Sequence, residues 1–224
     1  MPGTLVVGDL ISRARSRHPT FDDRRHPDPV LLEALSDYQG DLVAEIITKD
    51  PSVLVNNFTQ ALPLAVFENG IAIPAYKYPF GVQATRTFGS NTKTYPIDLV
   101  NWGESAHYKH AAYLLNGILF LCGKSRDWEH EDSIIFLYVP EVADLATDTR
   151  DALTQVLTNL PDSARSTVIA FLAAEMASRG GAGPGQTPPD AASFAARWTL
   201  AEQKFLTEIG RKQTAVVGRV RDVF

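Results

Sequence analysis

Three histidines have the residue type of metal ligands. His107 and His110 are three residues apart, a spacing at which one helical face can present both imidazoles. His130 lies farther along the chain, inside the acidic run 129–132. Histidine pairs of this spacing are frequent, and nothing in the sequence brings the three imidazoles together. Whether they meet is left open, and we expect neither a bound metal nor a cofactor.

The candidate nucleophiles lack the surroundings that nucleophilic catalysis requires. Cys122, the only cysteine, is typical of a small buried strand residue. Ser105 and Ser125 lie near histidines in the sequence, but no Gly-x-Ser-x-Gly turn frames either serine. Residues 123–125 imitate the end of a phosphate-binding loop, yet Ile118 occupies the position of the required upstream glycine. We therefore expect no catalytic residue and no enzymatic activity.

The bulk composition narrows the class of protein. The 224 residues carry a net charge of -5, whereas a general nucleic-acid binder is normally basic. No apolar run approaches the roughly 18 residues that a membrane-spanning helix needs, so we expect no membrane partner. A single cysteine allows no intrachain disulfide and fits a reducing compartment. A cytoplasm, or a particle assembled there, is the simplest location.

The charges are unevenly distributed along the chain. A basic patch near the N-terminus contains Arg13, Arg15, Arg17, Arg24 and Arg25. The C-terminal end is also basic, while the segment 127–151 is acidic. Opposite charges on one chain can attract neighbouring copies. An ordinary solvated surface is the alternative, and non-specific contact with DNA phosphates is a further one.

The N-terminal part of the chain has a helical pattern. A short helix is predicted from Asp9 to Arg17, with Asp9 as its N-cap. A longer helix is predicted from residue 27 to Lys49, because proline is tolerated in a first turn. We assign residues 1–61 to a helical body.

A second helical pattern follows residue 140. Helices are predicted over 149–160 and 164–179, the latter capped by Asp162 or Ser163. The segment 141–179 therefore completes the predicted helical body.

Between these segments, residues 62–140 change to short apolar runs that are typical of strands. The Asn-Gly pairs at 69–70 and 116–117 each predict a β-hairpin. The predicted strands cover 64–67, 71–76, 82–88, 92–100, 112–115, 118–122 and 133–139. A helix over 106–115 is the alternative for that stretch. We therefore predict an α+β fold, in which an antiparallel β barrel or sandwich is inserted into a helical bundle built from both ends of the chain.

The last part of the chain is a predicted linker followed by a long helix. Glycine and proline dominate residues 180–189, and Asp190 can cap a helix over 190–224. Such a helix is a candidate for docking to a partner, although packing on its own domain explains the pattern equally well. The candidate partner-binding residues are Phe194, Trp198, Phe205, Ile209, Arg211, Lys212, Arg219 and Arg221.

The sequence resembles the helical core of head–tail connector (adaptor or neck) proteins of tailed bacteriophages. The stretches that carry the resemblance are residues 9–15, the helix to Lys49, and the run 160–179 that enters its helix through Leu-Pro. They cover about a third of the chain. The strand-rich segment 62–140 is larger than the hairpin of compact adaptors, so another tail or baseplate protein could share the plan.

The resemblance implies a non-enzymatic structural protein of the virion that joins the portal to the tail. Its implied partners are further copies of itself in a ring, dodecameric by family resemblance, together with the portal protein and downstream neck or tail proteins. DNA would pass through the centre of the ring.

Two hypotheses from other classes are also open. The β module could bind a ligand among its aromatic residues, which are Tyr76, Tyr78, Trp102, Tyr108 and Trp128. Alternatively, the histidines could serve a metalloenzyme, which analysis of bound metal would detect.

Overall fold

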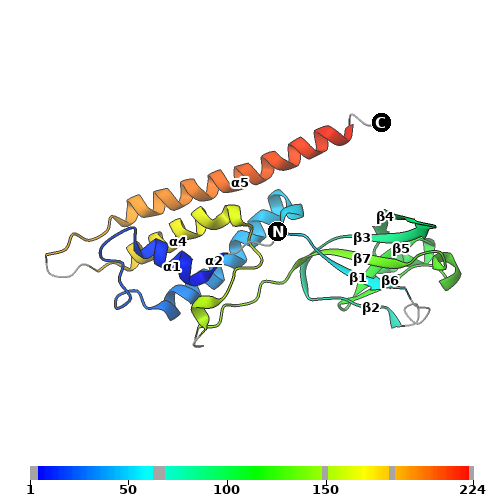
Figure 1. The fold of residues 1–224 in the computed structure, drawn as a ribbon, viewed down its shortest axis with the longest axis horizontal. Coiled ribbons are helices and arrows are strands. Elements are labelled where there is room, and N and C mark those ends of the chain that lie inside the picture. Colours follow the sequence, from blue (N-terminus) through cyan, green and yellow to red (C-terminus); the bar gives the residue numbers. More distant parts are fainter. Residues whose placement is uncertain (1–4, 63–68, 148–150, 182–184, 222–224) are drawn as a thin grey trace. The chain divides into compact units, whose positions relative to one another are not determined.

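The chain folds into two compact units. The computed structural model describes residues 5–62, 69–147, 151–181 and 185–221, with side chains in the last helix described as far as Arg211. One unit consists of residues 1–53 and 142–224, and the other of residues 54–141. Long helices build the first unit and a sheet builds the second (Figure 1). The predicted α+β class is therefore confirmed, as is the long C-terminal helix.

Two helices form the N-terminal part of the helical unit. Helix α1 spans Val7–Arg15 and buries one apolar face against the unit. Its N-cap position is Val6, which offers no side-chain hydrogen bond, so the predicted capping role of Asp9 is wrong. Helix α2 spans Asp28–Lys49 and begins directly after Pro27, as predicted.

The predicted helix over 149–160 is wrong where the structure describes it. Only a short 3₁₀ turn, Ala152–Thr154, forms there, and the chain is otherwise non-helical. Backbone contacts join Val6 with Val156, Val7 with Gln155 at 2.9 Å, and Leu157 with Leu5 at 3.0 Å. In this pairing with residues 5–7, the backbone amides and carbonyls of 155–157 form their hydrogen bonds with a distant segment, whereas in a helix they would form them with residues four positions away.

Two further helices complete this unit. Helix α4 spans Arg165–Arg179 and follows a 3₁₀ turn, Asp162–Ala164, without a side-chain cap, so the predicted capping by Asp162 or Ser163 is wrong. Helix α5 spans Ala191–Arg221 and lies alongside α4 (Figure 1). The Asp190 carboxylate accepts hydrogen bonds from the backbone amides of Ala192 and Ser193 at 3.2 and 3.3 Å, which confirms its predicted cap.

The second unit is a seven-stranded, barrel-like sheet with the strand order β1-β7-β3-β4-β5-β6-β2. The strands are β1 Asn56–Ala61, β2 Ile71–Ala72, β3 Tyr76–Phe88, β4 Asn91–Leu99, β5 Ala111–Leu115, β6 Ile118–Leu121 and β7 Ser133–Pro140. All neighbouring strands are antiparallel except β4 and β5, which are parallel, so the prediction of a wholly antiparallel sheet is wrong. Strand β1 falls within residues 1–61, which we assigned to the helical body. It forms part of the sheet instead, because its backbone pairs with β7.

The two Asn-Gly pairs behave differently. Asn116 and Gly117 have φ values of 51° and 75°, as the predicted β5–β6 hairpin requires. Asn69 is helical, and only Gly70 has a positive φ. The predicted strand 64–67 lies outside the described residues, and β2 pairs with β6. The prediction of positive φ at both residues of the first turn is therefore wrong, and the pairing of its strands stays a prediction.

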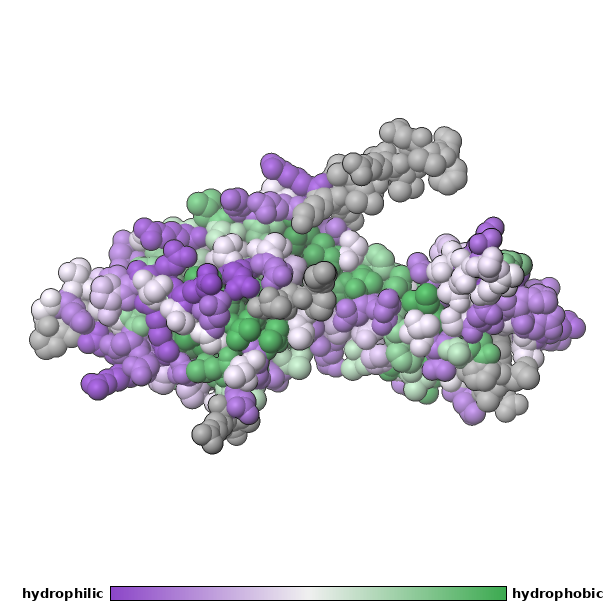
Figure 2. Space-filling view, in the orientation of Figure 1, coloured by the Kyte–Doolittle hydropathy of each residue, from purple (hydrophilic) through white to green (hydrophobic). Residues whose placement is uncertain are grey.

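The surfaces of the two units are mixed rather than uniformly polar. In the view of Figure 2, hydrophilic residues cover much of the helical unit, with apolar residues between them. The core of the sheet unit contains Trp128, Phe136 and Ile134, each 2% exposed or less.

Among the described residues, no helix is long and apolar enough to cross a lipid bilayer.

Candidate interaction site

The three histidines have separate environments. His110 stacks on the buried ring of Trp128, with centroids 4.7 Å apart. His130 and Glu129 form an exposed pair at 3.4 Å, and His107 is exposed at the end of a 3₁₀ turn. Within the part of the chain that the structure describes, no three His, Cys, Asp or Glu side chains are placed to hold a metal ion.

The environment of Cys122 and its neighbours indicates a structural role rather than a catalytic one. The thiol is buried, and burial raises its pKa, so the nucleophilic thiolate is disfavoured. The Cys122 carbonyl accepts a hydrogen bond from the Trp128 indole at 2.8 Å. The backbone amide of Lys124 donates to the Asp127 carboxylate at 2.8 Å. The segment that imitates a phosphate loop is therefore a capped turn.

The aromatic residues of the β-module hypothesis divide into two groups. Tyr76 packs edge-on against Phe136, and Trp128 is buried. Tyr78, Trp102 and Tyr108 are exposed, with Trp102 the most exposed at 63%.

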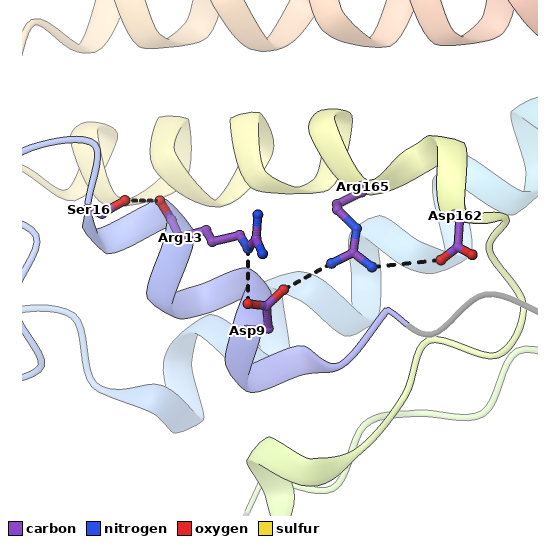
Figure 3. Close-up of polar contacts among 5 residues, drawn as sticks. All are labelled: Asp9, Arg13, Ser16, Asp162 and Arg165. Carbon is purple, nitrogen blue, oxygen red and sulfur yellow. Dashed lines mark hydrogen bonds and ion pairs between the residues drawn. The ribbon is translucent and has the colours of Figure 1, made fainter.

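Ion pairs within the helical unit occupy much of the basic N-terminal patch. The pairs are Arg13 with Asp9 at 2.9 Å, Arg15 with Asp28 at 2.6 Å, and Arg25 with Asp22 at 3.8 Å. Asp9 also binds Arg165 of α4, with an oxygen-to-nitrogen distance of 2.9 Å, and this ion pair connects α1 to α4 (Figure 3). Arg17 and Arg24 are exposed, and the described residues provide no ion pair for either. Contact with DNA stays a prediction.

The candidate partner-binding residues of α5 also have different positions. Phe205 and Ile209 are buried within the chain itself, at 4% and 3% exposure. Phe194 packs against Phe21 with ring centroids 5.3 Å apart, whereas Arg211 is exposed. The side chains of Lys212, Arg219 and Arg221 lie outside the described part. Partner binding by these residues stays a prediction.

A groove on the helical unit is a candidate binding site. Three aromatic side chains from different helices meet in its floor: Tyr38 of α2, Phe171 of α4 and Trp198 of α5. Tyr38 and Phe171 are stacked with centroids 4.0 Å apart, and Trp198 meets both edge-on at 5.8 and 5.4 Å. Phe171 and Trp198 are only partly buried, so aromatic surface faces the groove.

Hydrogen bonds fix the aromatic floor. The Tyr38 hydroxyl donates to a Glu202 carboxylate oxygen at 2.8 Å and accepts from the Trp198 indole at 3.2 Å. Burial and the acceptor carboxylate raise the pKa of Tyr38 well above its ordinary value. The phenol therefore stays protonated and keeps donating through neutral pH.

Carboxylates line the walls of this groove, which we call the acidic groove and which has a volume of about 650 Å³. They are Glu33, Asp37, Asp41 and Glu45 of α2, Glu175 of α4 and Glu202 of α5. Arg179 is the only cation among the described lining residues, and its guanidinium binds Glu175 at 2.7 Å. An aromatic floor with carboxylate walls suits a cationic ligand that also has apolar surface.

This groove was not predicted from the sequence. The signal that was available is the four-residue spacing of the α2 carboxylates, which places them on one helical face. The aromatic floor had no such signal, because its members come from positions 38, 171 and 198. Comparison with known proteins finds no matching family and no similar curated protein.

Proposed function

We propose that this protein is a non-enzymatic structural subunit of a virion, a head–tail connector that joins portal to tail in a homomeric ring. The observation that carries the proposal is the division of the chain: residues 1–53 and 142–224 build one helical unit, and residues 54–141 build a strand-rich unit between them. A helical bundle with an inserted β element is the plan that the resemblance to connector proteins implies.

Helix α5 supports a docking role. It has 31 residues against the 15 residues of α4, so at about 1.5 Å per residue it is roughly 24 Å longer than the helix alongside which it lies. The proposed partners are other copies of the chain, the portal protein and downstream neck or tail proteins. The ring would surround the DNA channel.

Truncation of α5 tests this proposal. Deleting residues 190–224 would also remove Phe205 and Ile209 from the core, so the chain is better ended at Arg211. The truncated protein should lose only the helical circular dichroism of residues 212–221 and should keep the melting temperature of the full chain. In a complementation assay for head–tail joining, it should fail to produce joined particles.

Two outcomes would count against the proposal. One is normal head–tail joining by the truncated protein. The other is failure of the full chain to co-purify with portal protein when the two are produced together.

A further inference from the structure

We propose that the acidic groove of one copy binds the C-terminal segment 212–224 of a second copy. This inference deepens the proposed function and rests on it only in assuming that the chain assembles with itself. The occupant is identified by the chemistry of the groove and by the reach of α5.

Charge complementarity favours this segment. Six carboxylates line the groove, and its one described cation is already bound to Glu175. Residues 212–224 contain Lys212, Arg219 and Arg221 against one acidic residue, Asp222. A basic segment that enters the groove therefore gains attraction along the whole acidic face of α2.

The apolar residues of the segment 212–224 also match the aromatic surface of the acidic groove. The segment 212–224 also contains four valines and Phe224, which can cover the partly exposed rings of Phe171 and Trp198. The acidic face of α2 from Glu33 to Glu45 is about 18 Å long, and a helical stretch from Lys212 to Arg221 is about 14 Å long. The two lengths are comparable.

The segment cannot reach the groove of its own copy. Helix α5 is continuous to Arg221, and Trp198 and Glu202 of the same helix already line the groove. Lys212 is ten residues beyond Glu202, so the helix carries it about 15 Å away along its axis. Because a continuous helix does not fold back on itself, a segment 212–224 that enters the groove comes from another copy.

Such a contact joins two different surfaces, the groove of one copy and the C-terminal segment of the next. Head-to-tail contacts of this kind produce rings when the rotation between copies closes, and filaments when it does not. A ring is the assembly that the proposed function requires.

Exchange of charges between the two surfaces provides the test. The groove variant carries Asp37→Lys and Asp41→Lys, both at exposed positions, and the tail variant carries Arg219→Glu and Arg221→Glu. Sedimentation velocity at low ionic strength should show each variant alone losing self-association at least tenfold in Kd. An equimolar mixture should regain it, because each reversed surface meets an oppositely charged one.

A matched control and a peptide assay complete the design. Asp98→Lys with Glu104→Lys makes the same charge change at exposed positions of the sheet unit and should leave association unchanged. A fluorescent peptide of residues 211–224 should bind the full chain more tightly than its scrambled version, and the groove variant should lose this binding. The inference is overturned if the groove variant associates normally, if the mixture is not rescued, or if neither self-association nor peptide binding occurs.

The proposed function has a separate readout. If the chain co-purifies with portal protein but the groove does not bind the segment 212–224, only this inference is contradicted. If the groove binds that segment but the chain neither binds portal protein nor joins heads to tails, only the proposed function is contradicted.

Discussion

Replacing Tyr38 with phenylalanine removes one oxygen atom that connects α2 to α5. The hydroxyl donates to Glu202 at 2.8 Å and accepts from Trp198 at 3.2 Å. The ring itself, which is stacked on Phe171, is kept by the substitution. Tyr38→Phe therefore separates the contribution of the two hydrogen bonds from that of the aromatic packing.

The size of the effect follows from the two partners. A hydrogen bond to a charged acceptor contributes about 1.5–3 kcal/mol, and a neutral one about 0.5–1.5 kcal/mol. Glu202 and Trp198 are only partly buried, so water can replace part of what is lost. We expect the free energy of unfolding to fall by about 2 kcal/mol. With a urea m-value of about 2 kcal/mol/M, the midpoint should fall by about 1 M.

The assay is equilibrium urea unfolding followed by helical circular dichroism, which reports on the helical unit. Tyr108→Phe, at an exposed position of the sheet unit, is the matched control and should leave this transition unchanged. A double-mutant cycle with Glu202→Gln should give a coupling energy of about 1 kcal/mol. A Tyr38→Phe midpoint equal to that of the original chain would refute the reasoning.

The same hydroxyl predicts a dependence on alkaline pH. Because the folded-state pKa of Tyr38 is raised above its ordinary value of 10.0, its contribution to stability is complete below about pH 10 and is lost as the pH rises further. Tyr38→Phe should therefore flatten the fall in stability above pH 10, measured as urea midpoints across that range.

Three further predictions concern other parts of the molecule. Burial lowers the pKa of His26 below 6.5, so the free energy of unfolding should decrease as pH falls below about 6.5, and His26→Phe should weaken that dependence in thermal melts at a series of pH values. Asp190→Ala should destabilise the start of α5 by about 1 kcal/mol, seen as faster hydrogen exchange at Ala192 and Ser193. Gly123→Ala should lower the melting temperature of the sheet unit, because φ is +91° and the added Cβ would meet a backbone oxygen at 2.5 Å.

Local signals predicted the elements whose boundaries depend on neighbouring residues. The β5–β6 hairpin follows from Asn116 and Gly117, since both must adopt positive φ at a tight turn. The start of α2 follows from its prolines, and the start of α5 follows from Asp190. In each of these cases the determining interaction lies within a few residues.

The predictions that failed depend on partners far away in the chain. Residues 155–157 pair with residues 5–7 at the start of α1, about 150 positions earlier, although their local pattern is helical. Strand β1 pairs with β7, about 77 positions later, and so belongs to the sheet rather than to the helical body. The parallel pairing of β4 and β5 likewise has no local signature.

The ion pairs of the basic N-terminal patch also include a contact that local sequence does not reveal. The pairing of Arg13 with Asp9 is visible in their four-residue spacing, but the pairing of Asp9 with Arg165 spans 156 positions. Net charge along the sequence therefore overestimated the unpaired basic surface near the N-terminus, because three of the five arginines are paired with aspartates. Of these pairs, only Arg15 with Asp28 joins two helices.

The row of carboxylates on α2 lowers the stability of the helix, so a contribution to folding does not explain why it is present. Glu33, Asp37, Asp41 and Glu45 form three successive pairs of like charges at four-residue spacing. Each such pair destabilises a helix by about 0.2–0.5 kcal/mol, so the row costs the isolated chain about 1 kcal/mol. A cation bound from outside would relieve this repulsion. Arg179, the one described cation of the groove, is bound to Glu175 of α4. The cations for the α2 row would come from the proposed basic segment of a neighbouring copy. The face is then better explained by binding than by folding.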